Sequence, residues 1–393
     1  MLSSPRKLET AAQLSAAEPE VATSNAPSPR TGASLVSLGT KTRNLFLVFG
    51  GASVEEGLSN ELYVLEADAA SAVAVWDKIQ PITSPDHPTP PPRYDHAAVA
   101  MEADGVLICG GAGPDGVCLD DLWSFDMETR EWTQLSPAGF GPSPRVMRGA
   151  MCLHPSDPRN VIVWGGGADG AHAVSDAAVY VLDLDTSTWT RHPPITGDGA
   201  HHPEVRLGHA LVPVDDASVL MFGGMDDAKV YDDAWILSMV TWQWTRVGQS
   251  AAFAVAGHAA TAVRADRLEQ TSTGSDSTAS AVVWTGGLTS SHAISSAWHC
   301  VSAATEWVPR PLLRLPQPVA AAMPTKGKKK PQPQQQQAAG HEEWMRLDHC
   351  VFAMEDADTE ETGVVLGVFG GMNHSSVFHD VHVARVSAAA IVL

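Results

Sequence analysis

Cysteines, basic residues and long apolar runs are all scarce in this 393-residue chain. The five cysteines form neither a C-x-x-C motif nor a pairing pattern, which argues against a disulfide scaffold and favours reduced, mostly buried thiols. Only 25 lysines and arginines accompany 45 aspartates and glutamates, so the formal net charge is −20 and general binding to nucleic acid is excluded. No apolar run reaches the length of a membrane span, and the N-terminal residues lack the apolar centre of a signal peptide. These features predict a cytoplasmic protein without membrane insertion, which we expect to be a monomer.

Motifs of catalysis and metal binding are equally sparse. The glycines form no phosphate-binding loop, because the glycine pairs end apolar runs and do not precede a helix. No G-x-S-x-G nucleophile motif is present, and the 16 histidines do not combine with cysteines or carboxylates in a compact ligand motif. We therefore expect no catalytic residue, cofactor or metal, and a non-enzymatic protein is the favoured interpretation.

Short apolar runs that end in a glycine pair are abundant. The second glycines stand at 51, 111, 166, 224, 287 and 371, so successive steps are 60, 55, 58, 63 and 84 residues. A recurrence at this spacing predicts a repeat architecture. The pairs are Gly50 and Gly51, Gly110 and Gly111, Gly165 and Gly166, Gly223 and Gly224, Gly286 and Gly287, and Gly370 and Gly371.

The second repeat shows the pattern most clearly. Four runs, 97–101, 106–109, 121–126 and 131–135, are separated by turn residues such as Asp104-Gly105 and Glu128-Thr129-Arg130. Four short strands joined by turns predict one four-stranded sheet, which is the blade of a propeller. Each glycine pair should end a second strand, where the backbone turns sharply and favours positive φ.

An aromatic residue in the third strand and a later tryptophan complete the pattern. An apolar run, a glycine pair, this aromatic residue and a tryptophan about twenty residues after the glycines together resemble the Kelch repeat. The resemblance covers nearly the whole chain and implies an all-β, six-bladed propeller of four-stranded antiparallel blades, without the BTB and BACK domains of ubiquitin-ligase adaptors. The tryptophans, expected in the core, are Trp76, Trp132, Trp189, Trp244 and Trp307.

The repeats divide a single domain, 1–393, into approximate blades 30–80, 93–136, 145–193, 206–248, 255–309 and 346–393. Three insertions interrupt them: a Pro-rich connection at 81–92, a Ser/Thr-rich loop at 266–280 and a Pro/Lys/Gln-rich segment at 311–340. We expect the last of these to be disordered. The last repeat lacks its tryptophan. Residues 8–15 resemble an outer strand and are predicted to complete the last blade; the alternative is that residues 388–393 do so.

Five of the six repeats begin with arginine. Strand parity places these blade starts, the glycine-pair loops and the 311–340 insertion on one face, while the 266–280 loop lies on the opposite face. In Kelch adaptors that bind peptides, arginines at equivalent blade starts contact acidic ligand side chains. The resemblance therefore makes a set of residues candidate partner contacts at an arginine-rimmed mouth: Arg30, Arg93, Arg145, Arg206 and Arg346, with Tyr94 and Arg148 beside them.

A structural role for the same residues stays open. Arginine and histidine at repeated positions also hold adjacent blades together, because buried polar groups need hydrogen-bond partners. Histidines follow the arginine by three residues at His96, His209 and His349, and His258 occupies the same place in the fifth repeat. We expect the histidines to be structural, whereas guanidinium groups also suit carboxylate recognition.

The favoured function is a protein-interaction module or scaffold that presents loops and the arginine-rimmed mouth to a partner, with an acidic segment as the expected ligand. An enzyme acting on a sugar, of the isomerase type found among bacterial Kelch proteins, is the alternative. A third possibility is that the 311–340 insertion captures the partner. Its lysine cluster at 326–330 also raises a nuclear location as an option beside the cytoplasm.

Overall fold

The computed structural model describes most of the propeller and leaves parts of the chain undescribed. The described residues are 25–38, 44–68, 73–85, 87–101, 105–145, 151–195, 201–227, 229–264, 280–303, 306–311, 346–354, 363–373, 375–378 and 380–387. Residues 8–15 and 388–393, and all but the first residue of 311–340, lie outside them, so neither candidate for the closing strand is described. None of the helices in the described part is long or apolar enough to cross a membrane.

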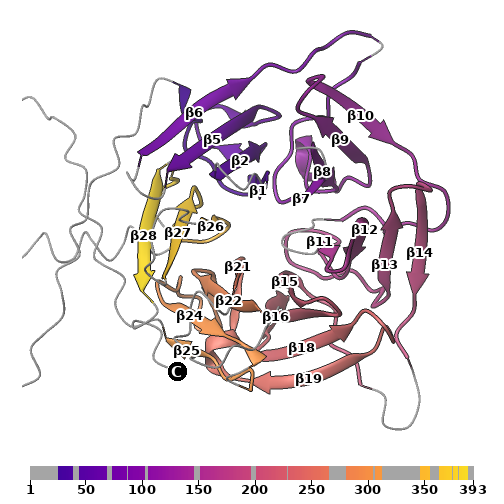
Figure 1. Ribbon diagram of the computed structural model, residues 1–393, viewed down its shortest axis with the longest axis vertical. Coiled ribbons are helices and arrows are strands. Elements are labelled where there is room, and N and C mark those ends of the chain that lie inside the picture. The colour runs from indigo at the N-terminus through magenta and orange to yellow at the C-terminus, as the bar shows by residue number, and fades with distance from the viewer. Residues whose placement is uncertain are drawn as a thin grey trace, which may run out of the picture.

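The second repeat folds as its sequence predicts. Strands β7 (Ala97–Met101), β8 (Gly105–Cys109), β9 (Leu122–Asp126) and β10 (Glu131–Leu135) pair in order as one antiparallel sheet. β7 is innermost and β10 lies at the rim of the molecule (Figure 1). All of β8 is buried, because both faces of this strand are covered by neighbouring sheets.

Four more sheets repeat this arrangement around a central axis (Figure 1). The first contains β1 (Ser34–Ser37), β2 (Asn44–Phe49), β5 (Leu62–Asp68) and β6 (Val73–Ile79), and the third β11 (Met151–His154), β12 (Asp157–Val163), β13 (Val179–Asp183) and β14 (Thr188–His192). The fourth contains β15 (Leu207–Asp215), β16 (Ser218–Asp226), β18 (Asp233–Ser238) and β19 (Trp244–Gln249), and the fifth β21 (Ala259–Arg264), β22 (Ser280–Thr285), β24 (Trp298–Val301) and β25 (Arg310–Pro311). Loops hold the short strands β3 (Ala52–Ser53), β4 (Gly57–Leu58), β17 (Lys229–Val230), β20 (Val255–Ala256) and β23 (Leu288–Thr289).

The last sheet departs from the expected count. It contains β26 (Cys350–Met354), β27 (Gly363–Phe369) and β28 (Val381–Ser387), and these are its only strands among the described residues. Five sheets therefore have the four strands expected of a blade. The last sheet lies between the first and the fifth and has three strands among the described residues (Figure 1). The difference arises because the stretches predicted to supply the outer strand lie outside the described part.

The apolar core lies between the sheets. Six clusters of buried side chains are present, and each joins two sheets that are neighbours around the ring. In one of them Phe46 and Trp76 of the first sheet pack with Phe352 and Phe369 of the last sheet. Every sheet therefore depends on both neighbours for burial, which is the expected behaviour of a repeat protein.

The positive φ predicted for the glycine pairs is confirmed at both glycines of all six pairs. Gly50 and Gly51 have φ of 70° and 93°, and Gly165 and Gly166 have 69° and 99°. One pair does not end its strand, because β16 continues through Gly223 and Gly224 to pair with β17.

The repeat tryptophans are less uniform than the pattern predicts. Trp76, Trp132 and Trp244 are buried within outer strands, whereas Trp189 and Trp307 are only partly buried. Trp307 has a φ of 59° and lies in the turn before β25, so it does not open the fourth strand of its sheet.

Candidate functional site

The five arginines at the blade starts share one position and one contact. Each donates a hydrogen bond from Nη1 to the carbonyl of the first glycine in the pair of its own repeat, over distances of 2.8 to 3.1 Å. The side chains are at most 1% exposed. The sharp turn at each glycine takes its carbonyl out of the hydrogen-bond ladder of the sheet. The guanidinium group therefore donates to a carbonyl that would otherwise have no partner within the sheet. The residues are Arg30, Arg93, Arg145, Arg206 and Arg346.

Four of these arginines also face an internal carboxylate. Arg93 contacts both oxygens of Asp121 at 2.6 and 2.7 Å. Burial opposes ionisation of Asp121, but the hydrogen bond and positive charge of Arg93 outweigh it and lower the pKa of this carboxyl. Arg206 and Asp233 form the same pair at 2.5 Å, and Arg346 lies 2.7 Å from Asp380.

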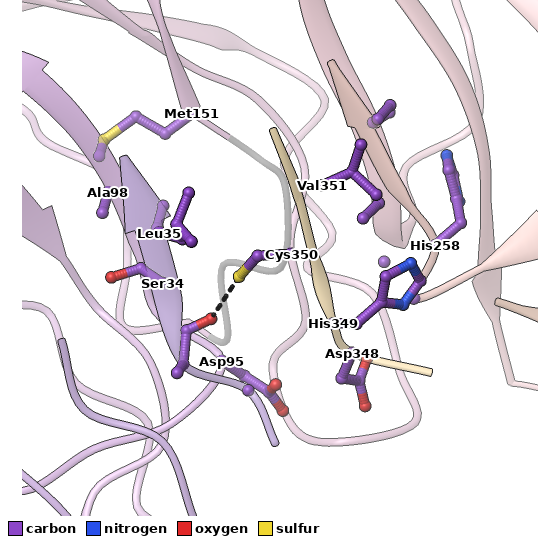
Figure 2. Close-up of a pocket in the computed structure, with 18 of the residues that line it drawn as sticks. Ser34, Leu35, Asp95, Ala98, Met151, His258, Asp348, His349, Cys350 and Val351 are labelled. Carbon is purple, nitrogen blue, oxygen red and sulfur yellow. Dashed lines mark hydrogen bonds between the residues drawn. The ribbon is translucent and has the colours of Figure 1, made fainter. Parts of the chain in front are cut away.

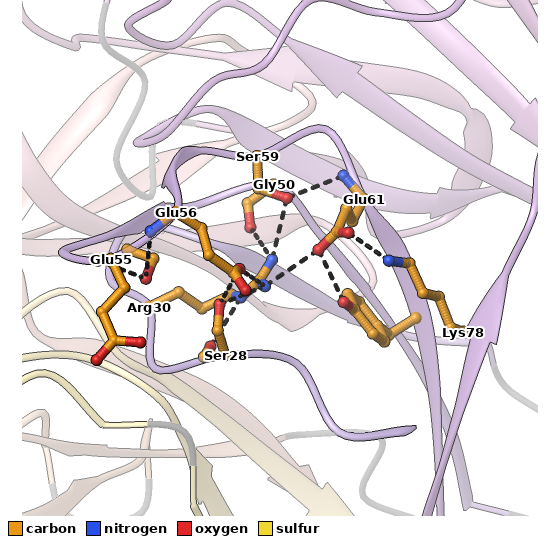
Figure 3. Close-up of polar contacts among 10 residues, drawn as sticks. Ser28, Arg30, Gly50, Glu55, Glu56, Ser59, Glu61 and Lys78 are labelled. Carbon is orange, nitrogen blue, oxygen red and sulfur yellow. Dashed lines mark hydrogen bonds and ion pairs between the residues drawn. The ribbon is translucent and has the colours of Figure 1, made fainter. Parts of the chain in front are cut away.

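Arg30 reaches its carboxylates less directly. Its Nη2 lies 3.4 Å from Glu61 and 3.9 Å from Glu56, and Glu61 also accepts from Lys78 (Figure 3). Glu56 accepts a 2.5 Å hydrogen bond from Ser28, which in turn contacts the guanidinium group of Arg30. This arginine therefore belongs to a shared network at the edge of the first sheet.

Arg145 is the exception in the described part of the chain, because no carboxylate lies within ion-pair distance of it. Its donors bond to Ser143 and to the Gly165 carbonyl, and its guanidinium carbon lies 5.7 Å from the centre of the Tyr180 ring. Ala178 stands where the second and fourth repeats place an aspartate. Burial lowers the pKa of Arg145, and the Asp176 carboxylate, which accepts a hydrogen bond from the Tyr180 hydroxyl, offsets this effect only in part.

The remaining candidate contacts are placed as follows. Tyr94 is half-buried, and its backbone pairs with Ala112 in the loop after β8. Arg148 lies outside the described residues. Direct contact between any of these residues and a partner stays a prediction. Because the other four blade-start arginines already face internal carboxylates, Arg145 is the favoured candidate for a partner's carboxylate.

The repeat histidines lie between the sheets. A Cβ added to Gly165 would lie 2.8 Å from Cε1 of His209, so the imidazole fills the space that the glycine leaves open. The corresponding pairs are Gly50 with His96, Gly223 with His258 and Gly286 with His349. Burial lowers the pKa of each of these histidines to about 3, so all four are neutral at neutral pH.

The residue before each repeat histidine, and Gly32 at the same place in the first repeat, form a hydrogen-bonded arc around the central axis. Gly32, Asp95, Gly208, Gly257 and Asp348 all have φ between 53° and 65°. The N–H of Asp95 donates to the Gly32 carbonyl at 2.8 Å, and that of Gly32 donates to Asp348 at 3.2 Å. The N–H of Asp348 donates to the Gly257 carbonyl, and the N–H of Gly257 donates to the Gly208 carbonyl. We call these five residues the turn ring.

A central cavity of about 250 Å³ lies beside the turn ring and is lined by residues of the innermost strands and their starts. Figure 2 shows Asp95 and Asp348 at the same end of the cavity, with Leu35, Ala98 and Met151 farther in. The Cys350 thiol donates to the Ala33 carbonyl at 3.3 Å. Within the described residues, no three histidine, cysteine, aspartate or glutamate side chains gather to hold a metal ion.

A family model confirms what the repeated sheets indicate. The model for the KLHDC2/KLHL20/DRC7 Kelch-repeats domain matches residues 10–157 and 107–306, which together cover more than half of the chain. The chain belongs to the Kelch-repeat family. The sequence resemblance to Kelch repeats is thereby confirmed, and the fold is a Kelch β-propeller with four-stranded antiparallel blades.

Curated relatives match over parts of their length. Acyl-CoA-binding domain-containing protein 5 of Arabidopsis thaliana is 30% identical over 201 residues, which cover 50% of this chain and 28% of that protein. The Rab9 effector protein with kelch motifs of Homo sapiens is 33% identical over 149 residues, or 36% of either chain. An F-box/kelch-repeat protein of Arabidopsis thaliana is 27% identical over 227 residues, covering 56% of this chain and 45% of that protein. The Kelch chain thus spans less than half of each of these relatives.

Several residues of the Kelch site were not found by sequence reasoning. The carboxylates that neutralise Arg93 and Arg206 stand two residues before a tryptophan, as Asp121 and Asp233, and this D-x-W pattern was a usable signal. The turn-ring carboxylates Asp95 and Asp348 occupy the third place of the R-x-x-H pattern, where three other repeats have glycine. That alternation of glycine and aspartate indicates a positive φ.

Proposed function

We propose that this Kelch propeller is a protein-interaction module whose partner binds the face that carries the blade starts and glycine-pair loops. Support comes from exposed apolar side chains at the tips of these loops. Val54 and Phe140 are each 84% exposed and Val117 is 59% exposed. These residues lie after β2, between β10 and β11, and after β8, so strand parity places them on one face. A protein partner that docks on this face would remove these apolar side chains from water, which favours binding.

The finer proposal is that an acidic side chain of the partner reaches Arg145. Four of the blade-start arginines face internal carboxylates within 4.0 Å, whereas Arg145 relies on neutral groups. A buried guanidinium group without a direct ion pair gains most from an incoming carboxylate. Arg145 is only 1% exposed and follows the exposed loop that carries Phe140, so the partner's carboxylate would approach it from this loop.

Loop substitutions test the docking face. Affinity capture from cell extract, followed by mass spectrometry, identifies the partner of the unaltered protein. Val54→Asp and Phe140→Asp should each lower the captured amount at least about tenfold, because they place a charge in an apolar contact. Val240→Asp is the matched control, since Val240 is 78% exposed in the turn between β18 and β19 on the opposite face. If only Val240→Asp abolishes capture, the interface lies on the opposite face and the proposal is overturned.

A second pair of variants tests the arginine. Arg145→Gln should weaken capture at least about tenfold, because a desolvated charge pair is lost. Arg93→Gln should instead lower the melting temperature, because Asp121 is left without its counter-ion. If Arg145→Gln melts normally and captures the partner fully, the arginine contact is wrong while the docking face stands.

The role of the insertion, the monomeric state and the cytoplasmic location belong to the same proposal. Deleting residues 312–340 should leave capture intact; loss of capture would favour the insertion as the binding element. The monomeric state and cytoplasmic location are proposed with it and are checked by light scattering and by imaging a fluorescent fusion. The matched relatives give the sugar-isomerase alternative no support.

A further inference from the structure

The connection between β10 and β11 carries a serine that contacts a buried arginine. Ser143 is exposed, whereas Arg145, two residues later, is only 1% exposed. Nη2 of Arg145 donates to the hydroxyl oxygen of Ser143 at 2.9 Å, and Nε donates to the Ser143 carbonyl at the same distance. The Ser143 hydroxyl is therefore held against a buried cation on an exposed loop, and docking at the loop tips does not use it.

The same backbone position recurs in other repeats and tolerates a negative charge. In four repeats Nε of the blade-start arginine donates to the carbonyl two residues earlier, over 2.9 to 3.1 Å. In the fourth repeat this earlier residue is Glu204. Its pKa is lowered chiefly by a hydrogen bond from Lys229 and further by the charge of Arg206. An anionic group two residues before the arginine is therefore compatible with the fold. The four earlier residues are Ser28, Pro91, Ser143 and Glu204.

The charges around Arg145 favour an anion at Ser143. The carboxylate of Asp176 acts on Arg145 from a distance. It is itself bound by Arg191 at 2.8 Å and by the Tyr180 hydroxyl at 2.5 Å. Because Arg191 balances the charge of Asp176, the positive charge of Arg145 stays available to a group on Ser143.

The local sequence of Ser143 suits a protein kinase that requires proline after the serine. Pro144 follows Ser143, and residues 139–145 belong to no helix or strand. A residue before proline favours the extended backbone in which a kinase binds its substrate segment. Ser84 and Ser136 also precede proline but have no arginine two residues later. Ser143 therefore combines an accessible Ser-Pro step with an arginine that its side chain already contacts.

We infer that Ser143 is a phosphorylation site of a proline-directed protein kinase, and that its phosphate binds the guanidinium group of Arg145. In the transfer, the hydroxyl oxygen of Ser143 forms a bond to the γ-phosphorus of ATP, while the bond from this phosphorus to the β–γ bridging oxygen breaks. ADP leaves with the electron pair, and the hydroxyl proton passes to the aspartate base of the kinase. The phosphate adds a charge of about −1.5 to −2 at neutral pH and three acceptor oxygens, which lie two bonds beyond the oxygen that Nη2 already contacts.

The phosphate takes the place that the proposed function gives to a carboxylate of the partner. Phosphorylation of Ser143 therefore closes Arg145 to the partner and weakens its capture. This consequence rests on the proposed function, whereas the pair of phosphate and arginine does not. The two are measured by separate experiments.

The first repeat offers a matched comparison, because Ser28, Pro29 and Arg30 have the same Ser-Pro-Arg sequence. There the serine hydroxyl donates to Glu56 at 2.5 Å, and Glu61 lies 3.4 Å from the guanidinium group (Figure 3). A phosphate on Ser28 would be placed against these carboxylates, which repel it. The fold should therefore favour phosphorylation of Ser143 over Ser28.

The first experiment incubates the full-length protein with a purified proline-directed kinase and ATP, and mass spectrometry measures the occupancy of both serines over time. Peptides 25–33 and 140–148, which place the serine at the same position, correct for the preference of the kinase itself. The ratio of Ser143 to Ser28 phosphorylation should be at least about tenfold higher in the protein than in the peptides. A ratio at or below that of the peptides overturns the inference.

Phosphorus NMR tests the pair with Arg145. The second pKa of the phosphate on Ser143 should lie below its ordinary value of about 6, because the guanidinium group favours the dianion. Unfolding the same phosphoprotein in urea should restore the ordinary pKa, and so should Arg145→Gln in the folded protein. Arg159→Gln is the matched control, because it removes an exposed guanidinium group that pairs with Asp185 on the opposite face. An equal phosphate pKa in the folded and unfolded protein refutes the pair.

Capture of the partner tests the consequence. The phosphorylated protein and Ser143→Glu should each capture at least about tenfold less partner than the unaltered protein. Ser136→Glu is the control, because it adds the same charge to an exposed position of the same connection, and it should leave capture unchanged. Full capture by the phosphorylated protein, where Arg145→Gln lowers capture, overturns the regulation. Full capture by both shows instead that the partner does not use Arg145, and the NMR titration still decides whether the phosphate does.

Discussion

At the scale of single residues, glycine sets how closely neighbouring sheets approach. Gly223 has a φ of 65°, and a Cβ at this position would lie 2.5 Å from the Val255 carbonyl oxygen and 3.0 Å from that of Phe253. Both obstacles are backbone atoms of the chain entering the fifth sheet, so a rotamer change cannot relieve them. The glycine pair is therefore required by the boundary between two sheets as well as by the local turn.

This requirement predicts that Gly223→Ala lowers the free energy of unfolding by about 2–4 kcal/mol, combining backbone strain with a steric clash. Gly57→Ala is the control, because Gly57 has a φ of 75° and nothing within 4 Å of an added Cβ. Its cost should be only the backbone strain of about 1–2 kcal/mol. Urea unfolding measures both, and equal losses would show that the clash is relieved.

The buried histidines predict an acid-sensitive fold. The pKa of His209 is about 3 in the folded protein against an ordinary value of 6.5, so the unfolded chain binds more protons between these pH values. Stability should therefore be complete above about pH 6.5 and fall as the pH is lowered. At pH 5 the loss is about 2 kcal/mol for each such histidine.

The measurement compares urea unfolding at pH 7 and pH 5. His209→Gln should reduce the difference between the two free energies by about 2 kcal/mol, whatever its effect at pH 7. His292→Asn should leave the difference unchanged, because His292 is exposed and asparagine accepts its φ of 61°. A pH dependence that His209→Gln does not alter would mean that this imidazole is not neutral and buried in the folded state.

The sequence predicted the environment of a side chain poorly where its interaction partner is distant in the chain. The repeats made glycine and tryptophan recognisable, because their backbone and packing roles recur locally. The state of Arg93 depends on Asp121, which is 28 residues later, and only the folded sheet brings the two together. Conversely, Arg145 differs from its counterparts because its own repeat has Ala178 at the corresponding position.

At the scale of strands, the inner three strands of each sheet follow the sequence more closely than the outermost strand. The inner strands are apolar and pack on both sides, whereas outer strands have one solvated edge and tolerate irregularity. In the fifth sheet the outer strand β25 is only two residues long, and Trp307 stands in the preceding turn. Periodicity could predict that the strand exists but not where it begins.

The outer strand of the last sheet is still a prediction. β28 pairs with β27 on one side, and no strand pairs with its other edge in the described part of the chain. If residues 8–15 pair there, deletion of residues 1–16 should lower the melting temperature by several degrees, because a strand and its burial are lost. Deletion of residues 388–393 is the matched comparison. An unchanged midpoint after the first deletion and a lowered one after the second would assign the strand to the C-terminus.

At the scale of the whole molecule, the ring closes through packing between the last and first sheets. One cluster joins the last sheet to the fifth, and another joins it to the first, so the last sheet has two apolar boundaries as every other sheet does. The six repeats predicted a closed ring, but no local pattern specified which side chains of the first and last sheets pack together.

Ring closure predicts that a defect in the last sheet is felt throughout the propeller. Val368 is 1% exposed in β27 and packs in the cluster shared with the fifth sheet, so Val368→Ala should destabilise by about 1–3 kcal/mol. Tryptophan fluorescence reports mainly on the other sheets, because β26, β27 and β28 contain no tryptophan, while Trp76 and Trp298 lie in the two clusters shared with the last sheet. The fluorescence and circular dichroism transitions should shift together, since no sheet retains its burial once a neighbour unfolds. A fluorescence transition that stays in place while part of the circular dichroism signal melts earlier would show that the last sheet opens alone and that the ring is not a single cooperative unit.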